Sequence, residues 1–95
     1  MTASTGDPRL APVGPARVVL YTRPGCHLCD QARAVVAQVA GPLGVGWREV
    51  DITSDAALEA RYREQIPVTA VDGVELSVWR VDAEQLRTAL QGRAG

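Results

Sequence analysis

The sequence predicts a small α/β fold in which a mixed four-stranded sheet is flanked by helices. Three observations support this prediction. A β-branched run at 17–22 leads directly into a helical apolar pattern, a second strand and helix follow, and an Asp72-Gly73 pair separates two more β-rich runs. A strand-helix-strand opening forms a right-handed parallel unit, and a later hairpin adds antiparallel strands. The expected order is therefore strand, helix, strand, helix, strand, strand, helix.

The chain of 95 residues has room for one compact domain. Its first segment, 1–16, carries three of the six prolines among small and polar residues. Such a segment has too little apolar surface to offset the entropy lost on ordering. We therefore expect a disordered tail at 1–16 and a folded domain at 17–92.

The first half of the domain is predicted from hydrophobic periodicity. The run "RVVLYT" is typical of a buried strand. After a Pro24-Gly25 turn, apolar residues recur at the spacing of one helical face, namely at Leu28, Ala32, Val35, Val36, Val39 and Leu43. We expect Gly41-Pro42 to end or fray this helix. A second strand is expected at 45–52.

The second half is predicted mainly from caps and turns. Residues 54–65 indicate a helix capped by Ser54 or Asp55, and Asp72-Gly73 is a strong hairpin signal. The alternation of apolar and polar residues after this turn predicts one buried face, made by Val74, Leu76 and Val78. A closing helix begins after Asp82, which precedes Gln85 by three positions as in a capping box. The aromatic residues fall on different elements and are expected to be packing residues: Tyr21, Trp47, Tyr62 and Trp79.

Charge and hydropathy exclude several classes of function. The chain has ten basic residues, all arginine, and eleven acidic residues, so its net charge is close to zero. It therefore has no positive field to bind nucleic acid or an anionic membrane. Apolar stretches fall short of the roughly 20 residues that span a bilayer, and no signal peptide is recognisable. We expect a cytoplasmic protein. In that compartment a lone cysteine pair favours catalysis or metal binding over a structural disulfide.

Both cysteines, Cys26 and Cys29, lie where the first strand gives way to the first helix. Residues three apart in a first helical turn are close enough to form a disulfide after a small adjustment. The helix amino terminus, with Arg23 and His27 adding positive potential, favours the thiolate of Cys26 and predicts that it is the nucleophile. Cys29 lies nearer the apolar face and suits a resolving thiol.

Two alternative interpretations fit the same residues. One is a redox-silent adaptor that keeps the fold without the chemistry. The other is a metal or iron-sulfur centre bridging two subunits, because Cys26, His27 and Cys29 are too few to complete a four-ligand zinc site within one chain. Haem attachment is not indicated, since Asp30 rather than histidine follows the second cysteine. No metal ligand is therefore assigned.

From about Arg17 to Leu90, the sequence resembles the glutaredoxin-like members of the thioredoxin-fold oxidoreductases. The resemblance rests on "YTRPGCHLC", on "QIPV" and on the Asp72-Gly73 hairpin. It implies a three-layer sandwich of glutaredoxin type and a dithiol-disulfide oxidoreductase. The chain departs from the family where glutaredoxins have a Gly-Gly pair that receives the glutathione carboxylate, because "SVWRVDAEQ" stands there instead.

The resemblance also implies the remaining site residues and the partners. A cis Ile66-Pro67 bond is expected beside Cys26, with Ile66, Pro67 and Arg23 contacting the substrate. His27 stands where glutaredoxins have proline, and it is expected to contact the substrate because it lies next to Cys26. The substrate is expected to be a disulfide-containing protein or a small thiol. No cofactor is implied, so a reductant protein or a low-molecular-weight thiol must restore the dithiol.

Overall fold

The computed structural model describes residues 16–92 and contains one mixed four-stranded sheet. Its strand order is β2-β1-β3-β4, in which β1 pairs parallel with β2 and antiparallel with β3, and β3 pairs antiparallel with β4. The elements follow the predicted order and are β1 (Val18–Thr22), α1 (His27–Leu43), β2 (Trp47–Asp51), a short 3-10 helix η1 (Ile52–Ser54), α2 (Ala56–Tyr62), β3 (Val68–Val71), β4 (Val74–Val78) and α3 (Ala83–Gly92). Except for Ala16, the tail predicted at 1–16 lies outside the described residues.

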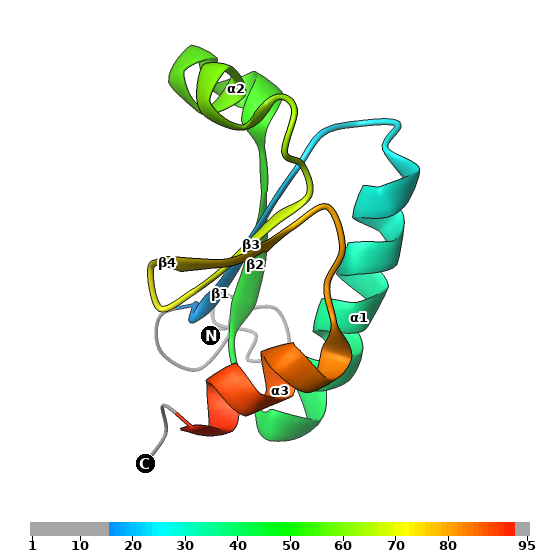
Figure 1. Cartoon of the computed structure of the whole chain (residues 1–95), viewed down its shortest axis with the longest axis vertical. Helices are drawn as coiled ribbons and strands as arrows, with labels where there is room; N and C mark the ends of the chain where they lie inside the picture. Colours follow the sequence, from blue (N-terminus) through cyan, green and yellow to red (C-terminus); the bar gives the residue numbers. More distant parts are fainter. Residues whose placement is uncertain (1–15, 93–95) are drawn as a thin grey trace, which may run out of the picture.

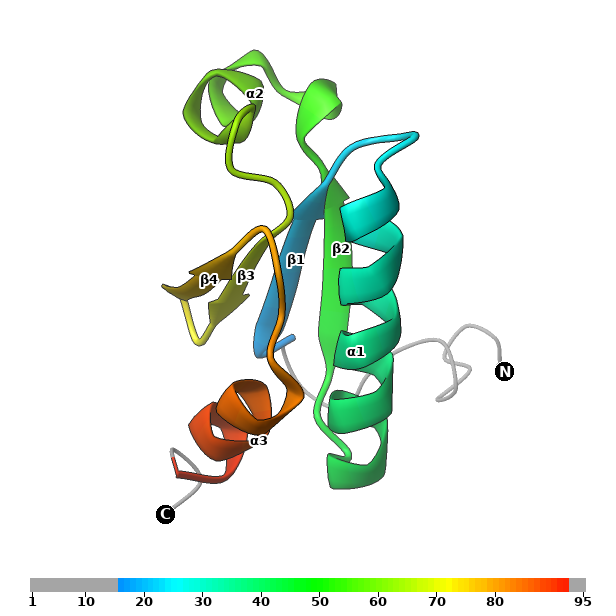
Figure 2. The same ribbon diagram turned by 45° about the vertical axis from the view of Figure 1, so that its right-hand side comes forward.

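The helices divide unequally between the two faces of the sheet. Helices α1 and α3 pack together on one face, and α2 lies beyond the end of β1 at which α1 begins (Figures 1 and 2). Tyr62 of α2 stacks on Tyr21, which points away from α1 because it alternates with the buried Leu20. The third layer of the sandwich is therefore present but small. No helix within 16–92 is long and apolar enough to span a bilayer.

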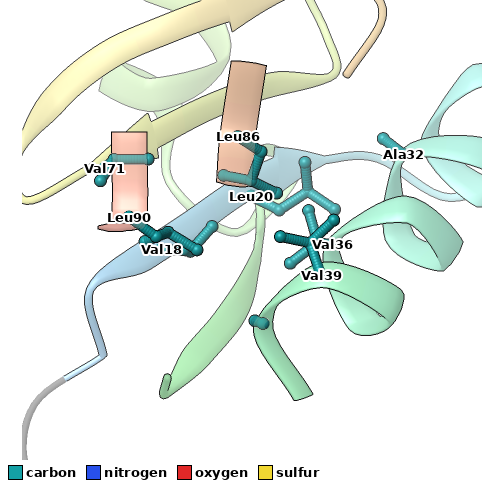
Figure 3. Packing of buried hydrophobic residues seen from close by; sticks show 9 residues of the cluster. Val18, Leu20, Ala32, Val36, Val39, Val71, Leu86 and Leu90 are labelled. Carbon is teal, nitrogen blue, oxygen red and sulfur yellow. The ribbon is translucent and has the colours of Figure 1, made fainter. Parts of the chain in front are cut away.

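The largest group of buried side chains, which we call the main core, fills the space between the sheet and helices α1 and α3 (Figure 3). All of its members are aliphatic, and none is more than 4% exposed. They are Val18, Leu20, Ala32, Val36, Val39, Ala40, Val71, Leu86 and Leu90. The helical spacing seen in the sequence thus does place one face of α1 on the sheet.

Helix α1 continues past the Gly41-Pro42 pair at which we expected it to end or fray. Proline in the last turn removes only one intrahelical hydrogen bond. The helix ends at Gly44, whose φ of 68° is a left-handed conformation that suits glycine. The Gly44 amide donates to the Gly41 carbonyl and the Val45 amide to the Ala40 carbonyl, each at 3.0 Å. This Schellman motif, rather than the proline, ends the helix.

The predicted hairpin is present, but its second strand is irregular. Asp72 and Gly73 have φ values of 52° and 84°, as a two-residue hairpin turn requires. The register then shifts by one residue, because Thr69 pairs with Ser77 whereas Ala70 pairs with Glu75. The expectation of one buried face is therefore wrong. Leu76, at the irregularity, packs against the main core, whereas Val78 packs against a second group of buried side chains. Val74, at the hairpin end of this edge strand, is 63% exposed.

Aspartates cap both of the shorter helices. The Asp55 carboxylate accepts hydrogen bonds from the amides of Ala57 and Leu58, and the Asp82 carboxylate accepts them from Glu84 and Gln85. Helix α2 is shorter than predicted and ends at Tyr62. The start of α3 after Asp82 is confirmed.

Candidate active site

A tight turn at the end of β1 brings the first cysteine to the amino terminus of α1. Gly25 has a φ of 77°, a conformation that glycine adopts without steric cost, and it redirects the chain between the strand and the helix. Cys26 then takes an extended backbone conformation as the N-cap of α1. The predicted location at a strand-to-helix junction is confirmed.

The side chain of Cys26 caps the helix. Its Sγ accepts a hydrogen bond from the backbone amide of Cys29 at 3.2 Å. Amides in the first turn have no partner within the helix, and the helix macrodipole places positive potential at this end. The side chain is partly buried, so solvent reaches the residue. A negative charge on this sulfur is therefore supported by the local backbone.

Cys29, one turn further on, is only 1% exposed. Burial raises the pKa of its thiol to about 11, and interactions with Cys26 and the charge on Glu49 add to the rise, while a backbone hydrogen bond at Arg23 opposes it. Cys29 therefore remains a neutral thiol near pH 7. The greater enclosure expected for this residue is confirmed.

A second group of buried side chains, which we call the second cluster, surrounds the thiol of Cys29. Its buried members come from five elements or loops: Cys29, Ile52, Tyr62, Ile66 and Val68. Cys26 and Tyr21 pack against it from the edge. The Ile66-Pro67 bond is cis, as the resemblance implied, and Pro67 is fully buried. The fold thus brings Ile66 into the same cluster as both cysteines, although nearly forty positions separate them in the sequence.

Arg23 and His27 flank the cysteine pair on the surface. Both side chains are exposed, and within residues 16–92 neither of them makes a hydrogen bond or an ion pair. Both side chains are therefore available to an incoming molecule.

A polar network beside the cysteines was not predicted from the sequence. Arg33 of α1 donates two hydrogen bonds to the Glu49 carboxylate of β2, each at 2.7 Å, and a third to Asp30 at 2.8 Å. The hydroxyl of Thr22, which is 3% exposed, donates to the same carboxylate at 2.7 Å. Arg33 holds the pKa of Glu49 below its usual range.

This network links the end of β1, the first two turns of α1 and the edge strand β2. These are the segments on either side of the cysteine turn. Arg33 and Glu49 are sixteen positions apart in the sequence, and only the parallel pairing of β1 with β2 makes them neighbours. Charged residues are common on amphipathic helices and on edge strands, so no local sequence pattern predicts that Arg33 and Glu49 pair.

The aromatic residues behave differently from one another. Tyr21 and Tyr62 stack with ring centroids 4.7 Å apart, which confirms that they are packing residues. Trp79 does not follow that expectation, because it is 54% exposed and has a positive φ of 68°. It follows β4 directly and lies close to the cis-proline segment, since its backbone amide donates to the Pro67 carbonyl at 2.7 Å.

The side chains around the cysteine pair bear on metal binding as well as on redox chemistry. In the described part of the chain, no group of three or more histidine, cysteine, aspartate or glutamate side chains is arranged to hold a metal ion. What the site does contain is a pair of free thiols with different environments. The arrangement is chemically suited to thiol-disulfide exchange.

The mixed sheet, the cysteine pair at the start of α1 and the cis-proline segment define a glutaredoxin-like protein of the thioredoxin superfamily. Residues 17–91 match the family model described as "Glutaredoxin-like domain (DUF836)", and the chain belongs to this family. A similar relative is protein Rv0508 of Mycobacterium tuberculosis, which is 33% identical over 76 residues, covering 75% of this chain and 78% of the relative.

Solved structures support the same assignment. Protein XcR50 from X. campestris is 41% identical with a TM-score of 0.66, and the match covers 79% of this chain and 96% of that protein. Fasciola hepatica thioredoxin is 23% identical with a TM-score of 0.55, covering 79% of this chain and 77% of that protein. The second likeness concerns the fold alone.

Proposed function

We propose that the protein is a dithiol-disulfide oxidoreductase in which Cys26 is the nucleophile and Cys29 the resolving thiol. The thiolate of Cys26 attacks one sulfur of a substrate disulfide, forms a mixed disulfide and releases the first substrate thiolate, which takes up a proton. Cys29 then loses its proton and attacks Cys26 Sγ. This step forms the Cys26–Cys29 disulfide and releases the second substrate thiol, so two electrons pass to the substrate.

The observation that carries the proposal is the asymmetry between the two sulfurs. Cys26 Sγ accepts an amide hydrogen bond at a helix amino terminus, where an anion is stabilised. Cys29 is 1% exposed and its pKa is raised to about 11, so it is protonated when Cys26 reacts. A pair with these properties separates the attacking role from the resolving role.

The same geometry explains when Cys29 becomes reactive. Part of the rise in its pKa comes from the hydrogen bond and the charge interaction with Cys26. Both are lost once Cys26 is held in a neutral mixed disulfide. The pKa of Cys29 then falls, although burial, the largest cause of its rise, remains, so substrate capture makes the resolving thiolate easier to form.

The remaining site residues are proposed to contact the substrate. Arg23 and His27 are exposed beside Cys26, and Ile66 shares a cluster with both sulfurs. The backbone around Pro67 is available to align the substrate chain. The substrate is a disulfide-bearing protein or a small thiol, and an external thiol or a reductant protein resets the pair without a cofactor. The expected cytoplasmic compartment, which keeps most thiols reduced, suits this direction of electron flow.

Single substitutions of the two cysteines test the proposal. Cys26→Ser should abolish reduction of a small disulfide, whereas Cys29→Ser should accumulate a mixed disulfide that mass spectrometry detects as a substrate adduct. Gln38→Ala, an exposed position further along α1, is the control and should keep wild-type activity. Full activity in both cysteine variants would instead identify a redox-silent protein.

A second experiment identifies the electron donor. The oxidised protein is incubated separately with a glutathione system and with a thioredoxin-reductase system, and free thiols are counted over time. The system that restores two thiols per chain is the donor. Failure of both systems, together with failure of dithiothreitol, would contradict a cycling dithiol.

A further inference from the structure

The segment between β4 and α3 carries a strained tryptophan next to the candidate active site. The Arg80 amide donates to the Val78 carbonyl at 2.8 Å, which closes a γ-turn with Trp79 at its centre. With a φ of 68° at Trp79, this is the rare and strained form of the turn. Such a conformation is unfavourable in a residue other than glycine and persists only where surrounding contacts hold it.

Three hydrogen bonds hold Trp79 against the cis-proline segment despite this strain. Its amide donates to the Pro67 carbonyl at 2.7 Å and to the Gln65 carbonyl at 3.3 Å, and its indole Nε1 donates to the Glu64 carbonyl at 3.1 Å. The indole nevertheless remains 54% exposed. The structure therefore presents a large apolar ring to solvent in one defined orientation beside Ile66 and Pro67.

Trp79 forms one wall of a groove whose other wall is α1. The groove has a volume of about 130 Å³ and is lined by Leu28, Gln31, Ala32, Val35, Trp79, Arg80 and Val81. Neither cysteine lines the groove, but Leu28 lies between them in the first turn of α1, and Trp79 is hydrogen-bonded to Pro67, so the groove borders the segments that carry the candidate active site. The segment before α3 rises to the level of the first turns of α1 (Figures 1 and 2).

The size of the groove decides what it can hold. Pockets that enclose a whole small molecule measure roughly 300 to 1,000 Å³, whereas a cavity of about 150 Å³ takes a single benzene-sized group. At about 130 Å³, this groove fits one apolar side chain. The rest of such a ligand has to lie outside, as the main chain of an extended polypeptide does.

The positive charge at the groove sets a second requirement on the chemistry of its ligand. Arg80 is its one charged lining residue, and its side chain is exposed. Within residues 16–92, no carboxylate forms an ion pair with it. A guanidinium without a partner favours a carboxylate on the ligand.

We infer that this groove docks an extended segment of a protein disulfide substrate in which an apolar and an acidic residue flank the reacting cysteine. The apolar side chain lies between Leu28 and Trp79, and the carboxylate meets Arg80. Trp79 and Arg80 are thereby specificity-determining residues. This inference rests on the proposed function, whose substrate class it narrows.

Kinetics with matched peptide disulfides test the inference. One peptide carries Leu and Glu beside the cysteine, and the other carries Ser and Lys at these positions. Trp79→Gly suits the positive φ and should raise KM for the Leu-Glu peptide about tenfold. Gln38→Ala, an exposed position on α1 outside the groove, is the matched control and should leave KM for both peptides unchanged. Trp79→Phe, which keeps an aromatic ring but loses the indole donor, should lie between Trp79→Gly and the wild type.

Charge reversal tests the second contact. Arg80→Glu should invert the preference between Glu and Lys peptides, and Arg48→Glu, an exposed position on the opposite edge strand β2, is the matched control and should not. Equal KM values for both peptides in the wild type, or an unchanged KM in Trp79→Gly, would overturn the docking groove.

A binding measurement separates failure of the groove from failure of the proposed chemistry. Trp47 and Trp79 are the two tryptophans of the chain, so Trp47→Phe leaves the groove residue as the sole fluorophore. In this background, with both cysteines changed to serine, the Leu-Glu peptide with its thiols blocked should shift the emission and the Ser-Lys peptide should not. A shift without any disulfide reduction by the parent protein would support the groove and contradict the chemistry; no shift would contradict the groove.

Discussion

The main core and the second cluster are both buried, but they differ in what their side chains can do. The main core is aliphatic throughout and contributes only packing. The second cluster contains a thiol, a tyrosine whose hydroxyl is hydrogen-bonded at 2.9 Å, and Ile66 next to a cis bond. The comparison shows that the fold separates stability from reactivity. The main core consists only of hydrophobic side chains, whereas the second cluster holds the Cys29 thiol, whose protonation state determines its reactivity.

The largest expected effect on stability comes from the main core. Leu86 is fully buried, and Leu86→Ala should lower the free energy of unfolding by about 3 kcal/mol through lost transfer energy and a residual cavity. Urea unfolding measures this change. Leu43→Ala is the control and should cost under about 1 kcal/mol, since Leu43 is 37% exposed. Altered reactivity of the cysteines in folded Leu86→Ala would show that the two regions are not separate.

The second cluster should instead make stability depend on pH. In the reduced protein, the pKa of Cys29 is raised from 9.0 to about 11 on folding, so the folded state holds this proton more tightly than the unfolded state. The resulting stabilisation is complete below about pH 9 and is lost as the pH rises through 11, by about 2.7 kcal/mol for a shift of two pKa units. Denaturation at several pH values measures the loss, and Cys29→Ala should remove it. A flat profile would contradict a buried, protonated thiol.

A smaller effect is expected from the hydroxyl of Tyr62. Tyr62→Phe removes the hydrogen bond to Glu75 and should lower the free energy of unfolding by about 1 kcal/mol while keeping the ring stack. Tyr21→Phe is the control within the same stack, because the Tyr21 hydroxyl has no hydrogen-bond partner among residues 16–92. If the two substitutions had equal effects, the hydroxyl of Tyr62 would be contributing nothing.

The smallest effect is expected from the network at the edge of the second cluster. Glu49→Gln should change the free energy of unfolding by under about 1 kcal/mol, since its ion pair with Arg33 is solvent-exposed. It should also lower the pKa of Cys29 slightly, because the negative charge on Glu49 contributes to its rise. Alkylation of Cys29 across pH in a Cys26→Ser background measures the shift. Glu59→Gln on α2 should leave it unchanged.

The sequence alone determined the order of the elements, the capping of the later helices and the placement of Cys26 at a helix amino terminus. Periodicity, caps and turn dipeptides are local properties, and for this reason they are readable without the fold. The enclosure of Cys29 was also predictable, because its position on the apolar face of α1 follows from helical spacing. The cis Ile66-Pro67 bond was predicted only from the family resemblance, because only about 5 to 6% of X-Pro bonds in folded proteins are cis.

Only the tertiary structure decided which distant residues meet. The bulge at Leu76, the Arg33–Glu49 pair and the exposure of Trp79 all depend on how strands align and where the segment after β4 returns to α1. A one-residue change in register turns every side chain of a strand to the opposite face of the sheet. No residue type near the bulge predicts this change. The reactive pair is thus a local feature of the chain, whereas the groove beside it exists only because the fold brings its walls together.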